Sequence, residues 1–192
     1  MPTLKAAYFD SLYAGKADPW DFAASPYEAA KYAATLAALP RHCYLSALEI
    51  GCSIGVLTAG LASRCDALLA VDIAEAALVQ ARVRNAGQRH VRFALGQFPD
   101  ALPANAAGYD LIMLSEVLYY LDMPTLLAAA QVTLEQARTG ADIMLVHWLG
   151  PTPDYPLTGD AAAEAFIAAL RPGVEVVLQR REENYRIDLM RR

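Results

Sequence analysis

The sequence predicts an α/β fold with a seven-stranded, mostly parallel sheet, a C-terminal antiparallel hairpin and helices on both faces. From residue 46 onward, short apolar runs alternate with helical segments, as in parallel sheets with crossover helices. The last two apolar runs are separated by three polar residues, which favours antiparallel pairing. With 192 residues and 56% hydrophobic content, the chain should form one domain, 1–192. Strands are expected at 46–51, 67–72, 90–95, 109–114, 142–148, 174–181 and 185–190, and helices at 55–64, 74–85, 123–138 and 160–170.

An N-terminal arm precedes this alternation. Residues 1 to about 25 concentrate aromatic side chains among turn residues. Ser25 as N-cap and Pro26 at the first helical position then predict a helix rich in good helix formers. We expect the arm and this helix, residues 1–40, to form a lid on a core of residues 41–192.

Composition favours small-molecule partners. The net charge of -5 and the pI near 5.2 disfavour non-specific binding to nucleic acid or anionic membranes. The three cysteines lack CxxC spacing, so we expect neither disulfides nor a bound metal. The chain has no run of eighteen apolar residues and no basic leader followed by an apolar stretch. We therefore expect a soluble, cytoplasmic protein that does not bind membranes.

A glycine-containing loop at residues 51–55 predicts a cofactor site. It follows an apolar strand, and Gly51 permits a sharp turn. Gly55 permits close approach of a cofactor or packing of the following helix, whose N-terminal amides would face the ligand. Asp72 lies 21 residues after Gly51 at a strand end, where a carboxylate can accept hydrogen bonds from ribose hydroxyls. The pattern indicates an adenosine-containing cofactor, although Asp72 could instead be a helix N-cap.

Glu49 narrows the choice of cofactor. An acid beside the loop would repel a pyrophosphate and attract the amino group of a methionine moiety. The loop also departs from GxGxxG, because Ser53 and Val56 occupy the second and third glycine positions. Both features favour S-adenosylmethionine over NAD. An NAD-dependent oxidoreductase and a non-catalytic module that binds S-adenosylmethionine stay open as alternatives.

The same loop matches GxSxG, the nucleophile elbow of α/β-hydrolases. Asp110 or Asp142, followed by His147, would even supply the triad in the right order. However, only 50 residues precede Gly51, whereas a hydrolase needs a strand and an oxyanion loop before its elbow. The hydrolase interpretation also leaves Glu49 unexplained, so it is disfavoured.

Residues 49–55 resemble motif I of class I S-adenosylmethionine-dependent methyltransferases, which have a Rossmann-like fold. Residues 96–99 resemble the adenine-contacting loop after the third strand. Residues 109–121, together with 18–20 and 25–28, are similar to the NodS-like subgroup, nodulation N-methyltransferases that act on an amino sugar of a chitooligosaccharide. The resemblance implies cofactor contacts from Glu49, Gly51, Cys52, Ser53, Gly55, Asp72, Ile73, Gln97, Phe98 and Ser115.

Two residues are candidates for catalysis. Glu116 follows a buried strand, where an acid must be paired, solvated or functional. His147 ends another apolar strand at the carboxyl edge of the sheet, where open α/β folds bind ligands. Either could orient an amine or hydroxyl acceptor and take its proton, or could be structural. Trp20 and Tyr27 are the arm residues most expected to touch cofactor or substrate, and the aromatic loop after Trp148 should border the acceptor pocket and suits sugar rings.

Overall fold

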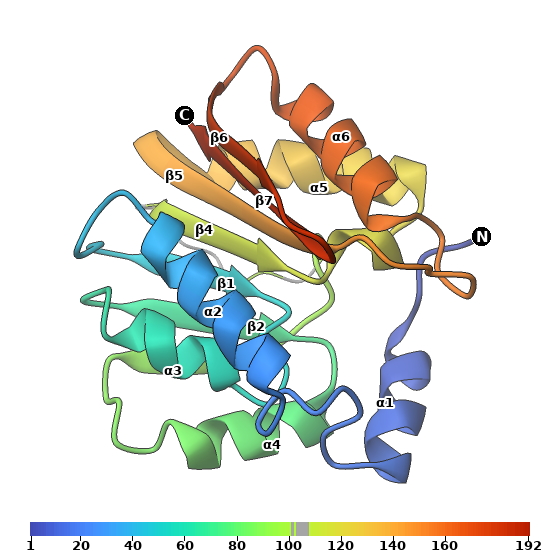
Figure 1. Cartoon of the computed structure of the whole chain (residues 1–192). Coiled ribbons are helices and arrows are strands. Elements are labelled where there is room, and N and C mark those ends of the chain that lie inside the picture. Colours follow the sequence, from blue (N-terminus) through green and yellow to red (C-terminus); the bar gives the residue numbers. More distant parts are fainter. Residues whose placement is uncertain (101, 103–107) are drawn as a thin grey trace. The chain divides into compact units, whose positions relative to one another are not determined.

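The computed structural model describes residues 1–100, 102 and 108–192, and they divide into two compact units. The N-terminal unit is Lys5–Gln97, and the C-terminal unit combines Met1–Leu4 with Phe98–Arg192. The strands form a seven-stranded sheet in the order β3-β2-β1-β4-β5-β7-β6 (Figure 1). This mostly parallel sheet with a C-terminal antiparallel hairpin confirms the predicted Rossmann-like fold class.

The N-terminal unit contains three short parallel strands. Ala47 pairs with Leu68 and Leu68 pairs with Val91, so the strands end at one edge. Helix α4 contacts helices α1 and α3 and strands β2 and β3. The elements are α1 (Ala6–Gly15), α2 (Pro26–Ala38), β1 (Ala47–Ile50), α3 (Val56–Ala62), β2 (Leu68–Asp72), α4 (Glu75–Arg84) and β3 (Val91–Leu95).

The two N-terminal helices differ in how well local sequence explains them. Ser25 caps α2 as predicted, because the Glu28 amide donates to Ser25 Oγ at 3.3 Å. Helix α1 has no side-chain cap, and its residues were expected only as part of an N-terminal arm. It buries Phe9 and Tyr13, so tertiary packing of its aromatic side chains stabilises it.

In the C-terminal unit, strand β5 lies between the fully buried strand β4 and the β6–β7 hairpin. Helices α5 and α6 pack against each other, and both contact β5 (Figure 1). Strand β5 pairs in parallel with β4 and antiparallel with β7. The elements are β4 (Tyr109–Ser115), the 3₁₀-helix η1 (Leu118–Tyr120), α5 (Met123–Gln136), β5 (Ala137–Trp148), α6 (Gly159–Leu170), β6 (Glu175–Arg181) and β7 (Tyr185–Arg191).

Strand β5 starts earlier than the predicted residue 142. Ala137 pairs with Tyr109, and the register then shifts so that Asp142 pairs with Leu111. The extra residues form a bulge in which Gly140 has a φ of 80°. The helix expected to reach residue 138 ends at Gln136 because the chain enters the strand directly.

The first residues of the chain are bound to the start of α5. The Thr3 amide donates to Asp122 Oδ2 at 3.1 Å, and the Asp122 amide donates to Thr3 Oγ1 at 2.9 Å. Asp122 also caps α5 by accepting from the Thr125 amide. These bonds explain why Met1–Leu4 belongs to the C-terminal unit.

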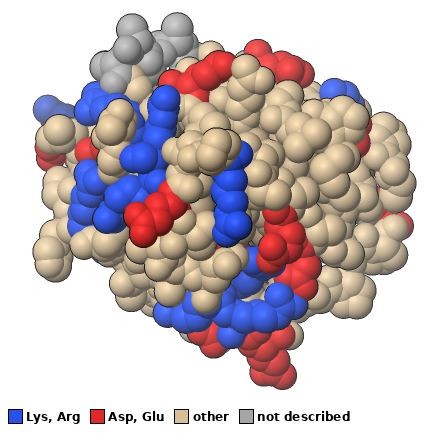
Figure 2. Space-filling view, turned by 90° about the horizontal axis from the view of Figure 1, so that it is seen from above, with Lys and Arg blue, Asp and Glu red and all other residues tan. Residues whose placement is uncertain are grey.

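Charged side chains of both signs share the surface. Figure 2 shows acidic residues interspersed with basic ones on the face turned to the viewer. Several form ion pairs, such as Arg82 with Glu75 at 2.6 Å. Within the described part of the chain, none of the helices has the length and apolar character that a membrane span requires.

Candidate functional site

The glycine loop, Gly51–Gly55, connects β1 to α3 through three left-handed residues. Gly51, Ser53 and Gly55 have φ values of 77°, 49° and 76°. The amides of Gly51 and Cys52 both donate to the carbonyl of Val71, which ties the start of the loop to β2. The predicted sharp turn at Gly51 is therefore present.

Gly55 is required by packing inside the N-terminal unit. A Cβ on this residue would lie 2.9 Å from both Cα and Cβ of Ala81 on α4. The Asn85 amide group donates to the Gly55 carbonyl at 3.1 Å and to the Ala81 carbonyl at 2.9 Å. Gly55 was predicted to permit either close approach of a cofactor or packing of the following helix. The structure supports a packing role, but the helix that packs against Gly55 is α4.

Asp72 ends β2 with its carboxylate held by backbone amides. Oδ2 accepts from the Ser53 amide at 2.7 Å, and Oδ1 accepts from the Ala74 amide at 2.9 Å. Burial raises the pKa of this carboxyl, while the amides of Ala74, Ser53 and Ile73 oppose that rise. Asp72 is not the N-cap of α4, because that position is Ala74. Each carboxylate oxygen retains capacity for a further donor, such as a ribose hydroxyl.

Glu49 is the second buried acid near the loop. Its side chain is almost fully buried, and Oε2 accepts a hydrogen bond from the Thr58 hydroxyl at 2.6 Å. Burial raises the pKa of Glu49 to about 8, the Thr58 bond opposes this rise, and the charge of Asp72 adds to it. A carboxyl group with this pKa can ionise when a cationic group binds next to it.

Tyr13 of α1 reaches the glycine loop, which sequence reasoning missed. Its hydroxyl oxygen lies 2.5 Å from Ser53 Oγ in a hydrogen bond between residues 40 apart in the chain. Burial raises the pKa of Tyr13, so the phenol stays protonated. The aromatic composition of the arm was the only signal, and it did not single out Tyr13.

Trp20 and Tyr27, the two residues singled out near the N-terminus, lie in different surroundings. The Trp20 ring meets Tyr13 edge-on, with centroids 5.9 Å apart, and stacks on Phe22 at 5.4 Å. The Tyr27 ring lies 5.4 Å from the Lys31 ammonium. Trp20 and Tyr27 are both half-buried within the N-terminal unit, and their contact with cofactor or substrate stays a prediction.

The remaining predicted cofactor residues lie at the ends of strands. Ile73 follows Asp72 and is half-buried, and so is Gln97, two residues after β3. Phe98 and Ser115 belong to the C-terminal unit, where both are buried. Their contacts with a cofactor stay predictions.

Glu116 joins the ends of β4 and β5. Its Oε2 accepts hydrogen bonds from the Tyr119 hydroxyl and from the Trp148 amide, both at 2.8 Å. Its own amide donates to the carbonyl of Val146, and its φ is 55°. A non-glycine residue in this strained conformation is typical of functional sites. The side chain is half-buried, so it can be reached from solvent.

His147 lies beneath η1 rather than at the surface. It has no exposed area, and its Nε2 accepts from the Leu118 amide at 3.2 Å. Its ring meets Tyr119 edge-on, with centroids 5.6 Å apart. In this structure the residue holds η1 against β5, and its predicted contact with substrate stays a prediction.

A cluster of aromatic side chains packs around η1 in the C-terminal unit. Tyr155 stacks on Tyr119, with centroids 5.4 Å apart, and meets Tyr120 at 4.7 Å. Tyr155 lies in the β5–α6 loop, Leu149–Thr158, which was expected to be aromatic and to border the acceptor. The tyrosines of η1 were visible in the sequence, but only the structure reveals that they stack with Tyr155.

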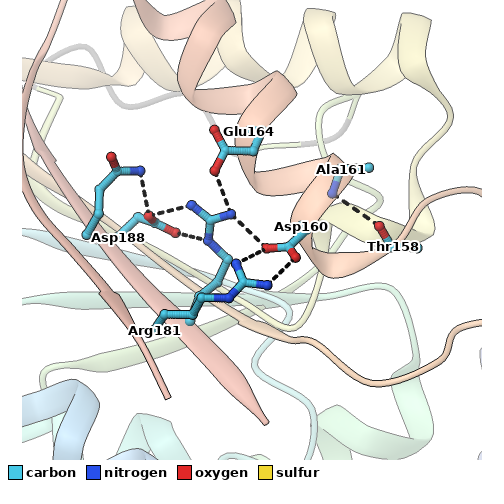
Figure 3. A network of polar contacts seen from close by, with 8 residues as sticks. Thr158, Asp160, Ala161, Glu164, Arg181 and Asp188 are labelled. Atoms are coloured by element: carbon cyan, nitrogen blue, oxygen red, sulfur yellow. Dashed lines mark hydrogen bonds and ion pairs between the residues drawn. The ribbon is translucent and has the colours of Figure 1, made fainter. Parts of the chain in front are cut away.

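A network of ion pairs holds the C-terminal end of the β5–α6 loop, where α6 begins (Figure 3). Arg186 binds Asp188 through two nitrogens, at 2.7 and 2.8 Å, and also binds Glu164 at 2.7 Å. Asp160, at the start of α6, accepts from Arg186 and from both terminal nitrogens of Arg181. The network therefore holds the first turns of α6 on the β6–β7 hairpin.

The side chains near the glycine loop offer acceptors for the hydroxyl and amino groups of S-adenosylmethionine. Two buried carboxyls and a left-handed loop are gathered at one edge of the N-terminal unit. Among the residues that the structure describes, no three His, Cys, Asp or Glu side chains are grouped to bind a metal ion.

Comparisons with known proteins point to one family. Residues 12–145 match the family model for Nodulation protein S (NodS). Nodulation protein S of Bradyrhizobium diazoefficiens is 34% identical over 105 residues, which cover 54% of this chain and 49% of that protein. The chain spans about half the length of the curated relatives it matches.

Solved structures agree with the fold. A candidate methyltransferase from Pseudomonas syringae is 33% identical, with a TM-score of 0.75 over 86% of this chain and 99% of its own. The N-methyltransferase NodS from Bradyrhizobium japonicum, crystallised with S-adenosylhomocysteine, is 22% identical, with a TM-score of 0.81 over 98% of each chain. Since the family model covers most of the chain and the Pseudomonas relative is matched along nearly its full length, the chain belongs to the Nodulation protein S (NodS) family.

Proposed function

We propose that the protein is an S-adenosylmethionine-dependent methyltransferase acting on a small-molecule acceptor. The observation that carries the proposal is the pair of buried carboxyls, Glu49 and Asp72, on adjacent strands next to the glycine loop. Such a pair of carboxyls can ionise beside a cationic amino group and offers no cationic partner to a pyrophosphate. The name of the Bradyrhizobium japonicum relative, an N-methyltransferase, agrees with the proposal.

The N-terminal unit would hold the cofactor through complementary polar groups. Asp72 would accept hydrogen bonds from both ribose hydroxyls, since each of its oxygens has capacity left. Glu49 would attract the amino group. S-adenosylmethionine supplies an activated methyl group when it is bound. Further contacts within this unit are proposed for Trp20, Tyr27, Gly51, Cys52, Ser53, Gly55, Ile73 and Gln97.

The C-terminal unit would bind the acceptor, for which we propose an amine of an amino sugar or oligosaccharide. Tyr120 and Tyr155 are half-buried aromatic side chains packed on the buried Tyr119, and aromatic rings of this kind suit the packing of sugar rings. Glu116, which is half-buried at the end of β4, would accept the proton of the amine. His147 would act by holding η1 in place through the Leu118 amide.

The N-terminal arm and α2, residues 1–40, would act as a lid. The contact between Tyr13 and Ser53 joins α1 to the glycine loop, and Gln80 of α4 donates to the Ala17 carbonyl at 2.7 Å. A lid would exclude water from the cofactor and help to align the reacting atoms.

A cytoplasmic location is part of the same proposal. The three cysteines, Cys43, Cys52 and Cys65, lack the spacing of a disulfide framework, which fits a reducing compartment. The acidic balance of the chain supports small molecules rather than nucleic acid as partners.

The cofactor is tested by calorimetric titration with S-adenosylmethionine, S-adenosylhomocysteine and NAD. We expect binding of the first two and none of NAD. Asp72→Ala should weaken S-adenosylhomocysteine binding by roughly 10- to 100-fold, because the ribose hydroxyls lose a charged acceptor. Binding of NAD alone would support an oxidoreductase and contradict the proposal.

The acceptor is tested by mass spectrometry of glucosamine oligosaccharides incubated with the protein and S-adenosylmethionine. The expected product carries one additional methyl group on the amine. Cofactor binding without methylation of any amine or hydroxyl acceptor would favour a non-catalytic binding module.

A further inference from the structure

Ser53 is the non-glycine residue with a left-handed backbone inside the glycine loop, and the Tyr13 hydroxyl is bound to its side chain. We propose that Tyr13 is a positioning residue that holds Ser53 in the left-handed conformation and thereby fixes Asp72 for the cofactor. The inference rests on the proposed function for the identity of the ligand. The three residues involved all lie in the N-terminal unit.

The backbone of Ser53 is strained. Its φ of 49° places a side chain in a region where glycine is the favoured residue, and this conformation is unfavourable for other residues. Such a conformation persists only where the surroundings hold it. Two hydrogen bonds do so here, one from the side chain to Tyr13 and one from the amide to Asp72.

The second step is the link from Ser53 to Asp72. The Ser53 amide donates to Asp72 Oδ2 at 2.7 Å, and the Ala74 amide donates to Oδ1. If Ser53 relaxed to a negative φ, its amide would turn away from Oδ2. Asp72 would then lose one of the amide donors that set the direction of its carboxylate.

The third step is the rigidity of Tyr13. The side chain is only 8% exposed, and its ring is packed edge-on against Trp20. The hydroxyl is therefore held at the loop by the packing of α1. Ser53 stands at a position where the usual residue is glycine. Its hydrogen bond with Tyr13, 40 residues earlier in the chain, thus compensates for the backbone strain.

The test is a set of double-mutant cycles with S-adenosylhomocysteine binding measured by calorimetry. Tyr13→Phe should weaken binding about tenfold in the wild-type background, because the competent loop conformation becomes less populated. In the Ser53→Gly background, where a left-handed residue is unstrained, Tyr13→Phe should change the affinity by less than about twofold. Ser53→Ala keeps the strain and loses the hydroxyl, so adding Tyr13→Phe to it should weaken binding no further.

Tyr8→Phe is the comparison variant, because it removes a hydroxyl from another tyrosine of the same helix. If Tyr13→Phe weakens binding by the same factor in the wild-type and Ser53→Gly backgrounds, Tyr13 only anchors α1 and the inference is wrong. It is equally wrong if Tyr13→Phe has no effect in the wild-type background.

A measurement without ligand separates this inference from the proposed function. If the wild-type protein binds neither S-adenosylmethionine nor S-adenosylhomocysteine, the proposed function fails. Urea unfolding of the same variants still tests the pair, since Tyr13→Phe should reduce the free energy of unfolding more in the wild-type than in the Ser53→Gly background. Equal reductions would overturn the inference.

Discussion

At the residue scale, Glu49 links cofactor binding to stability. Burial raises its pKa from 4.5 to about 8 in the folded protein. Between these two pH values the folded state keeps the proton, whereas the unfolded chain has released it. The free energy of unfolding therefore falls as the pH rises through this window.

Glu49→Gln should remove this pH dependence. Relative to the variant, the wild-type protein should lose about 4 kcal/mol of unfolding free energy between pH 5 and pH 9. Urea denaturation of both proteins at both pH values measures this difference in unfolding free energy. The contributions of the other titrating groups cancel, because they are the same in the two proteins. The variant should also bind S-adenosylhomocysteine more weakly, since it lacks the carboxylate for the amino group. Identical pH profiles of the two proteins would contradict the buried, protonated state of Glu49.

Glu116 is the residue on which the proposed proton transfer depends. Glu116→Gln should lower kcat for a glucosamine oligosaccharide by at least about 100-fold, because an amide cannot accept the proton. Tyr119→Phe is the comparison, since it removes one hydrogen bond to Oε2 and leaves the carboxylate in place. Mass spectrometry of the methylated product gives both rates. Near-normal turnover by Glu116→Gln would exclude this residue as the base.

At the scale of elements, the two ends of the β5–α6 loop lie next to each other. A Cβ on Gly159, the first residue of α6, would lie 1.8 Å from the carbonyl oxygen of Trp148, the last residue of β5. The Arg186 network also binds α6 through Asp160 and Glu164. Tyr155 is therefore presented to Tyr119 and Tyr120 by a loop whose ends are fixed.

Gly159→Ala should destabilise the protein by about 1–3 kcal/mol, because the backbone of α6 must move away from β5. The matched control is Gly87→Ala, where a Cβ meets no atom within 4 Å. The control should change stability by less than about 0.5 kcal/mol. Thermal and urea unfolding measure both variants, and equal stabilities would mean that the close approach at Trp148 is easily relieved.

At the scale of the whole molecule, sequence patterns predicted the strands better than the side-chain contacts. Periodicity and turn residues are local signals, so the sheet and the capped start of α2 could be predicted. Helix α1 depends on the burial of Phe9 and Tyr13, which periodicity does not reveal. The motif identified Glu49 and Asp72, but the Tyr13–Ser53 contact depends on how distant segments fold together.

Hydrogen exchange can test whether the cofactor acts on the N-terminal unit. At a 100-fold excess over Kd, a ligand stabilises the state that binds it by about 2.7 kcal/mol. Because Tyr13 joins α1 to the glycine loop, S-adenosylhomocysteine should slow exchange in both Ala6–Gly15 and Gly51–Gly55. The β6–β7 hairpin, which carries none of the proposed cofactor residues, should show no local protection, and NAD should leave the whole pattern unchanged. Protection of the hairpin but not of the glycine loop would place the cofactor elsewhere and contradict the roles of Glu49 and Asp72.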